Sequence, residues 1–167
     1  MQPLQDIGGV AVTDWAKVHA EVVDEFARGW AAPGPHAWDG FLADDVEMVQ
    51  PMLRDGRGRT SWREETERLL ELLPDLRGEV LTWAGRADRL FIELRLTATL
   101  GRTPLEVRVV DQLALTPTGT VVRRESFFDP APMVRAVLRS PGHWPAWWRS
   151  GVGPLLARRR LGRPRRA

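Results

Sequence analysis

Two alternating runs follow each other in residues 89–115, RLFIELRLTATLGRTPLEVRVVDQLAL. In the first run, leucine or isoleucine occupies every second position from Leu90 to Leu96, with mostly polar side chains between them. The second run alternates in the same way from Leu105 to Leu115. A period of two gives each strand one apolar and one polar face, so this stretch predicts an antiparallel hairpin with one buried face.

The strand pattern continues on both sides of this hairpin. Residues 79–84 predict an earlier strand that breaks at Gly85, and residues 120–128 predict a last strand after a Thr-Pro-Thr-Gly loop. Asp129 is then a suitable cap for a helix that has Pro130 at its first position. The second half of the chain therefore predicts a meander of antiparallel strands that ends in a helix.

The first half predicts helices around one short strand. Apolar side chains recur every three or four residues over 14–30, where Thr13 is a suitable cap, and a short second helix is expected over 36–43. Val46 to Gln50 predicts a strand, and a Ser-x-x-Glu capping box predicts a third helix from Ser61. Helices followed by an antiparallel meander indicate the α+β class, with a sheet that curls over the helices.

The 167-residue chain has the length of one domain. Six of its 24 basic residues lie in the last ten positions, whereas the first 157 residues hold 18 basic and 22 acidic side chains, a net charge of −4. The folded part is thus mildly acidic, and a nucleic-acid partner is not expected. We expect an N-terminal arm over 1–12, the domain over 13–140, and a Trp/Arg-rich extension over 141–167 whose basic end is disordered.

Several classes of protein and site are excluded by what the sequence lacks. No apolar run reaches the 18 residues of a transmembrane helix, and the start has no signal-peptide pattern, so we expect a cytoplasmic protein. Without cysteine there are no disulfides, thiolate zinc sites or cysteine nucleophiles. Rossmann, phosphate-loop and serine-elbow motifs are missing, and His19, His36 and His143 lack metal-ligand spacing, so neither a metal nor a cofactor is expected.

One carboxyl interrupts the apolar face of the penultimate strand. Asp111 stands between Val109 and Leu113 on the face that should point inward. An ionised carboxylate is costly to bury alone, so it must find a partner, keep its proton or reach a water-filled cavity. A carboxyl in an apolar cleft is a candidate for acid–base chemistry, and a structural aspartate at a bulge or strand end is the alternative.

Strand pairing predicts the partner of this carboxyl. If Leu115 faces Thr120 across the hairpin loop, Asp111 lies opposite Arg124, and directly opposed residues share a face. A slip of one residue would bring Glu125 to that place instead. We therefore expect an inward-facing pair of Asp111 and Arg124.

The chain resembles the nuclear transport factor 2-like superfamily, in particular its SnoaL-like and ketosteroid-isomerase-like members, over residues 13–139. The resemblance rests on the order and spacing of four strings: VVDEFARGW at 22–30, FLADDVEMVQP at 41–51, VRVVDQLAL at 107–115 and GTVVRRESFFDP at 119–130. It implies a cone-shaped, curved antiparallel sheet wrapped around helices, a deep apolar pocket between them, and a homodimer.

Two enzyme mechanisms of this superfamily can be compared position by position. Ketosteroid isomerases have an aspartate base where this chain has Gln50 and a tyrosine where it has Phe26, and only their protonated aspartate is matched, by Asp111. Limonene epoxide hydrolase has an Asp-Arg-Asp set at the positions that are here Leu94, Leu96 and Ser126. We expect neither mechanism.

The predicted function is a pocket for a flat, apolar small molecule. Asp111 and Arg124 are its catalytic candidates, and eight further side chains are expected to bind the ligand: Phe26, Trp38, Met48, Gln50, Leu94, Ser126, Phe128 and His19. As an enzyme, the protein would be a polyketide cyclase or an isomerase that moves a proton next to a carbonyl. A non-catalytic binding or interaction module is the alternative.

Two features have more than one reading. His19 lies on the inward stripe of the first helix, either as a proton shuttle or as a satisfied core histidine, and the second is favoured. The extension carries Trp144, Trp147 and Trp148 before its arginines. We expect it to pack over the barrel as a lid or a dimer element, and attachment to an anionic membrane surface is the alternative.

Overall fold

A computed structural model describes residues 13–51 and 56–152 of the chain. The strands are β1 (Leu42–Val49), β2 (Gly56–Arg57), β3 (Arg77–Arg86), β4 (Arg89–Leu100), β5 (Thr103–Leu115) and β6 (Val121–Phe128). The helices are α1 (Trp15–Ala31), α2 (Arg59–Leu72), α3 (Ala131–Arg139), the short 3-10 helix η1 (Pro141–His143) and α4 (Trp144–Ser150). The predicted arm over 1–12 and the basic end of the extension lie outside the described residues.

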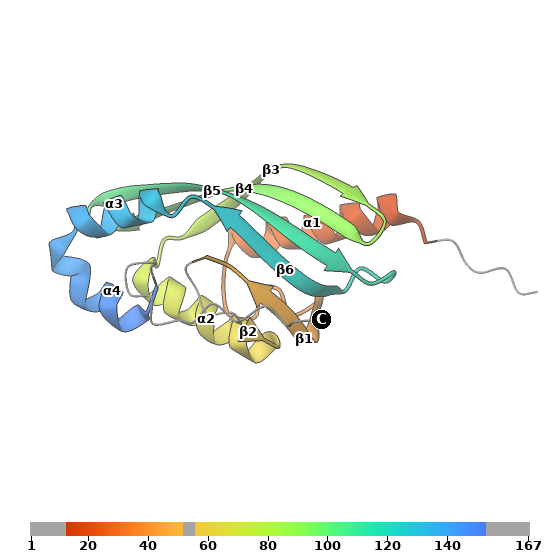
Figure 1. Ribbon diagram of the computed structural model, residues 1–167, viewed down its shortest axis with the longest axis horizontal. Coiled ribbons are helices and arrows are strands. Elements are labelled where there is room, and N and C mark those ends of the chain that lie inside the picture. Colours follow the sequence, from red (N-terminus) through yellow and green to blue (C-terminus); the bar gives the residue numbers. More distant parts are fainter. Residues whose placement is uncertain (1–12, 52–55, 153–167) are drawn as a thin grey trace, which may run out of the picture.

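The strands form one curved sheet in the order β2-β1-β6-β5-β4-β3. Neighbouring strands are antiparallel except β1 and β6, which run parallel. In Figure 1 the sheet arches over α1 and α2, and α3 and α4 follow β6 at one end of the molecule. The predicted α+β class, with a curved sheet wrapped around helices, is confirmed.

Helix α1 lies directly against β3 because two glycines leave room for its side chains. A Cβ at Gly78 would lie 2.8 Å from the Cβ of Trp30, and a Cβ at Gly85 would lie 2.4 Å from Nδ1 of His19. The predicted strand break at Gly85 is wrong, since β3 continues to Arg86. This glycine provides space for a histidine ring, and the strand does not end there.

Both predicted helix caps in the first half of the chain differ from the structure. Asp14 caps α1 in place of Thr13, and its Oδ1 accepts a hydrogen bond from the backbone N–H of Lys17. The predicted capping box is also wrong, because α2 has already begun before Ser61. The Ser61 hydroxyl donates instead to the backbone oxygen of Arg57, at 3.1 Å.

The helix predicted over 36–43 does not form. Residues 35–41 make hydrogen-bonded turns, and β1 begins at Leu42. The indole of Trp38 lies between two other indoles, with ring centroids 5.1 Å from Trp30 and 5.3 Å from Trp62. A segment this short has little helical stability of its own, so these tertiary contacts decide its conformation.

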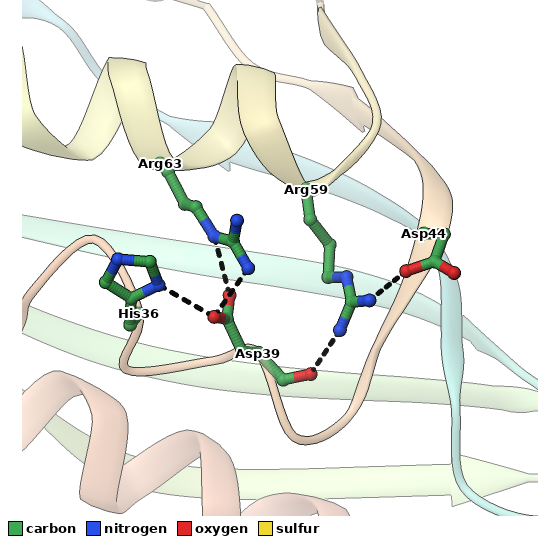
Figure 2. Close-up of polar contacts among 5 residues, drawn as sticks. All are labelled: His36, Asp39, Asp44, Arg59 and Arg63. Carbon is green, nitrogen blue, oxygen red and sulfur yellow. Dashed lines mark hydrogen bonds and ion pairs between the residues drawn. The ribbon is translucent and has the colours of Figure 1, made fainter.

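Ion pairs fasten the same turn segment to α2 (Figure 2). Asp39 accepts hydrogen bonds from Nε and Nη2 of Arg63, at 3.1 and 2.7 Å, and its Oδ2 lies 2.8 Å from Nδ1 of His36. Arg59 donates to the backbone oxygen of Asp39 and also pairs with Asp44. The hydrogen bond from Arg63 lowers the pKa of the Asp39 carboxyl below its usual value, although partial burial opposes the shift.

The register between β5 and β6 differs from the prediction by two residues. Asp111 pairs with Ser126, and Arg124 pairs with Leu113. Leu115 pairs with Val121, one residue beyond the predicted Thr120, and the register shifts by one more residue between Ala114 and Leu115. Because a two-residue shift preserves the face of every side chain, Asp111 and Arg124 still point to the same side of the sheet.

Candidate functional site

A buried ion pair lies at the centre of the candidate site. Asp111 is completely buried, and its Oδ2 accepts a hydrogen bond from Nε of Arg124 at 2.9 Å and forms an ion pair with Nη2 at 2.8 Å. Its Oδ1 accepts from the Ser126 hydroxyl at 2.5 Å. The predicted contact between Asp111 and Arg124 is therefore present, but it is diagonal across the strands. Donors on both oxygens fix the carboxylate, and the two opposite charges balance each other.

Three aromatic rings enclose the guanidinium of Arg124. Its Cζ lies 4.8 Å from the ring centroid of Trp62, 5.8 Å from that of Trp30 and 5.9 Å from that of Phe26. Aromatic faces attract a guanidinium, which is weakly hydrated and stacks well on them. The rings and the carboxylate together hold this buried arginine in one position.

An apolar pocket lies next to the ion pair, between α2 and the inner face of the sheet. Among its polar wall residues are Gln50, Arg124 and Ser126, and Nη1 of Arg124 lies 3.5 Å from Oε1 of Gln50. The space that a water molecule can reach inside is about 80 Å³, which is room for more than one water molecule. The apolar wall consists of Trp30, Trp62, Leu69, Leu73, Leu76, Leu96, Ala98, Leu105, Val107, Val109, Phe128, Met133 and Val152.

The pocket wall includes four of the ten predicted site residues, namely Gln50, Arg124, Ser126 and Phe128. Asp111 is not among the described wall residues, because it lies behind Arg124 and Ser126. Its carboxylate is thus connected to the pocket through the two side chains that it holds.

The other predicted site residues lie elsewhere in the fold. Phe26, Trp38 and Met48 line a separate gap beside Arg124, whose water-sized space is about 10 Å³ and which side chains otherwise fill. Leu94 is completely buried in the core. The space expected between Asp111 and the first helix is therefore packed, and the larger pocket lies on the side of α2.

The side chain of His19, on α1, packs against the turn between β3 and β4. Its Nε2 is 2.8 Å from the backbone oxygen of Ala87, and its ring packs against Trp15 and Trp83. The residue is buried and is not among the described residues that line the pocket. This is the geometry of a satisfied core histidine.

Sequence reasoning missed much of the apolar wall. Leu105, Val107 and Val109 share the strand face of Asp111, so the alternation could have identified them. Val152 had no comparable signal, because the segment around it has no regular apolar period. In the described ranges 13–51 and 56–152, no cluster of three His, Cys, Asp or Glu residues is placed to hold a metal ion. Nor is any helix there long and apolar enough to cross a membrane.

The fold and site define a class of α+β proteins with a curved sheet, a pocket under it and a polar group within the pocket. The SnoaL-like domain model matches residues 23–125, and the chain belongs to this family, within the nuclear transport factor 2-like superfamily. No curated protein sequence matches the chain.

Solved structures with low sequence identity share the fold. A candidate SnoaL-like polyketide cyclase from Jannaschia sp. CCS1 has a TM-score of 0.64 and 18% identity, over 77% of this chain and 97% of that chain. A ketosteroid isomerase-like protein from Catenulispora acidiphila DSM 44928, in complex with trimethylamine, has the same score and identity over 77% and 96%. TerC, co-crystallised with polyporic acid, has a TM-score of 0.65 and 17% identity over 72% and 98%.

Proposed function

We propose that the protein binds an apolar small molecule whose acceptor oxygen lies against Gln50, Arg124 and Ser126. The observation that carries this proposal is the buried amide nitrogen of Gln50, which has no hydrogen-bond partner among the described residues. The indole nitrogens of Trp30 and Trp62, on the same pocket wall, also lack one. An unpaired buried donor costs about 1–3 kcal/mol, which a ligand oxygen would offset. The unpaired nitrogens of Gln50, Trp30 and Trp62 are all hydrogen-bond donors, so the ligand should carry a hydrogen-bond acceptor.

Charge balance favours an uncharged acceptor group on this ligand. The positive charge of Arg124 is already balanced by Asp111 at 2.8 Å. A ligand carboxylate would therefore bring an uncompensated charge into apolar surroundings, which is unfavourable. A ketone or quinone oxygen on a flat ring system fits better. The polyketide cyclase-like structural neighbours support a polyketide-like ligand of this kind.

Three probes of nearly equal size test this proposal: acetophenone, ethylbenzene and benzoate. Ligand-observed NMR titration should show acetophenone binding about fivefold more tightly than ethylbenzene, the value of one hydrogen bond, and benzoate binding most weakly. Gln50→Leu should remove the preference for acetophenone. Gln112→Leu is the matched control, since Gln112 lies on the other face of β5.

Two results would contradict the proposed function. The first is that none of the three probes binds the wild-type protein. The second is that acetophenone and ethylbenzene bind equally well and that Gln50→Leu changes neither affinity.

A second candidate function is acid–base catalysis of the cyclase or isomerase type. Ser126 lines the pocket and donates its hydroxyl proton to Asp111. In this candidate, Ser126 takes a proton from the carbon next to the ligand carbonyl and passes its own proton to Asp111 Oδ1. The resulting enolate oxygen lies beside Arg124, and return of the proton to another carbon completes an isomerisation. A binding module in which the ion pair is only structural is the alternative.

We also propose that the protein is a cytoplasmic homodimer with no nucleic-acid partner. Phe91, Val110 and Phe127 lie exposed on the outer face of the sheet, away from the pocket. Contiguous apolar surface of this kind, rimmed by charged side chains, is typical of a protein–protein interface. The acidic balance of residues 1–157 supports the lack of a nucleic-acid partner.

A further inference from the structure

The pocket has a polar end and an apolar end, which follow from the order of residues on β5. Val109, Val107 and Leu105 line it at two-residue spacing, starting next to Asp111. A strand rises about 3.3 Å per residue, so this wall runs about 13 Å from Val109 to Leu105. A ligand whose oxygen lies at Arg124 therefore extends its apolar part toward Leu105.

The segment that follows α3 begins at this apolar end. The Ser140 hydroxyl donates to the backbone oxygen of Leu100 at 2.9 Å, and Thr103 Oγ1 lies 2.9 Å from the same hydroxyl. The ring of His143 packs against Gly101, where an added Cβ would lie 2.5 Å from ring carbon Cε1. These contacts fix the start of the segment to the hairpin between β4 and β5.

Helix α4 then crosses from this hairpin to α2, and Figure 1 shows it below α3 at the end of the molecule. Trp147 packs partly buried against the core. After α4 the chain turns inward, and the N–H of Val152 donates to the Ser150 hydroxyl at 3.2 Å. Val152 is only 1% exposed and lines the pocket together with Met133 of α3.

We propose that residues 141–152 form the end wall of the pocket and that Val152 limits the length of the ligand, an inference that rests on the proposed binding function. The ligand class is then an oxygen-bearing ring with a short apolar tail that points away from the ion pair. The inward contacts of Trp147 and Val152 favour the lid reading of this extension over the membrane-surface reading. The end wall lies beyond residues 23–125, which match the family model.

Phenyl alkyl ketones of increasing tail length, from acetophenone to octanophenone, test the end wall by titration calorimetry on the full-length chain. Each added methylene should strengthen binding to the wild-type protein about fourfold until the tail meets Val152, after which binding should weaken. Val152→Ala should move the best tail length up by about one or two methylenes, and Val152→Phe should move it down, because these changes remove or add side-chain volume at the wall. Val122→Ala and Val122→Phe, on the exposed side of β6, are matched controls that should leave it unchanged.

The outcomes separate the end wall from the binding function on which it rests. If the ketones bind but the best tail length is the same in wild type and both Val152 variants, the end wall is overturned and the binding function stands. If no ketone binds the wild-type protein, the binding function is overturned and the end wall with it. A best length that moves in opposite directions in the two Val152 variants, and not in the Val122 variants, supports the proposal.

Discussion

Arg124 belongs to the core and to the pocket wall at once. Its side chain is 6% exposed, and its charge is compensated by Asp111 and by the faces of three aromatic rings. A buried guanidinium without such compensation would be strongly destabilising. The same contacts that stabilise the arginine in the core also fix the position of its guanidinium at the pocket wall. Stability and ligand orientation therefore depend on one ion pair.

Asp111→Asn should destabilise the protein by about 3–5 kcal/mol, because it leaves the Arg124 guanidinium buried without its counter-charge. Chemical denaturation at neutral pH measures this change. The double variant Asp111→Leu with Arg124→Met removes both charges and should recover most of the loss. Glu93→Gln breaks an exposed pair with Arg108 and should cost at most about 1 kcal/mol. A cost for Asp111→Asn as small as that of Glu93→Gln would contradict this account of the ion pair.

The same site allows the catalytic candidate to be separated from the structural one. Ser126→Ala keeps the Asp111–Arg124 pair, so the protein should stay folded at the cost of one hydrogen bond, about 1–3 kcal/mol. If the acid–base candidate is right, wild-type protein exchanges the methyl protons of acetophenone with deuterium from the solvent, and Ser126→Ala loses this exchange. Exchange at the same rate in both proteins would contradict the role of Ser126, and no exchange above the rate without protein would support the binding module.

At the scale of elements, the turn segment 35–41 is held by its contacts with α2. Arg63 binds the carboxylate of Asp39, and Arg59 binds its backbone oxygen (Figure 2). The same segment carries Trp38, which packs against the pocket residue Trp62. The ion pairs thus keep the segment in place behind the aromatic rings that surround Arg124.

Asp39→Asn should lower the free energy of unfolding at pH 7 by about 1 kcal/mol, since the carboxylate is partly exposed and its pairing is screened by solvent. The pKa of Asp39 is lowered in the folded state, chiefly by the hydrogen bond from Arg63. The stability it contributes is therefore present above the unfolded pKa of about 3.9 and is lost as the pH falls through the lower, folded pKa. Urea denaturation of wild type and variant should show their difference shrinking below about pH 4.

Asp45→Asn is the matched control for the pH experiment, because Asp45 is an exposed partner of an exposed arginine. It should change stability by no more than about 0.5 kcal/mol. A difference between wild type and Asp39→Asn that stays constant from pH 7 to pH 3 would show that the carboxylate charge is not the cause.

At the scale of the whole molecule, the sequence predicts the sheet well and the pocket only in part. Alternation identifies β4 and β5, and it places Asp111 and Arg124 on the inner face even though the register is two residues off. A period of two determines the face on which a side chain lies, but it does not determine which residue of the neighbouring strand pairs with it. The position of Trp38 and the wall contact of Val152 depend on contacts between distant segments, which no local period encodes.

The outer face of the sheet leads to the last prediction, a homodimer formed through β4, β5 and β6. Phe91, Val110 and Phe127 are 42%, 39% and 49% exposed, and Val110 pairs directly with Phe127. Sedimentation velocity should therefore give about twice the chain mass of 18.9 kDa at micromolar concentration. Phe127→Lys should shift the protein to the monomer, because it places a charge in the apolar contact next to Val110. Leu138→Lys, at an even more exposed position on α3, should leave the dimer intact, and a wild-type monomer at 100 µM would contradict the proposed interface.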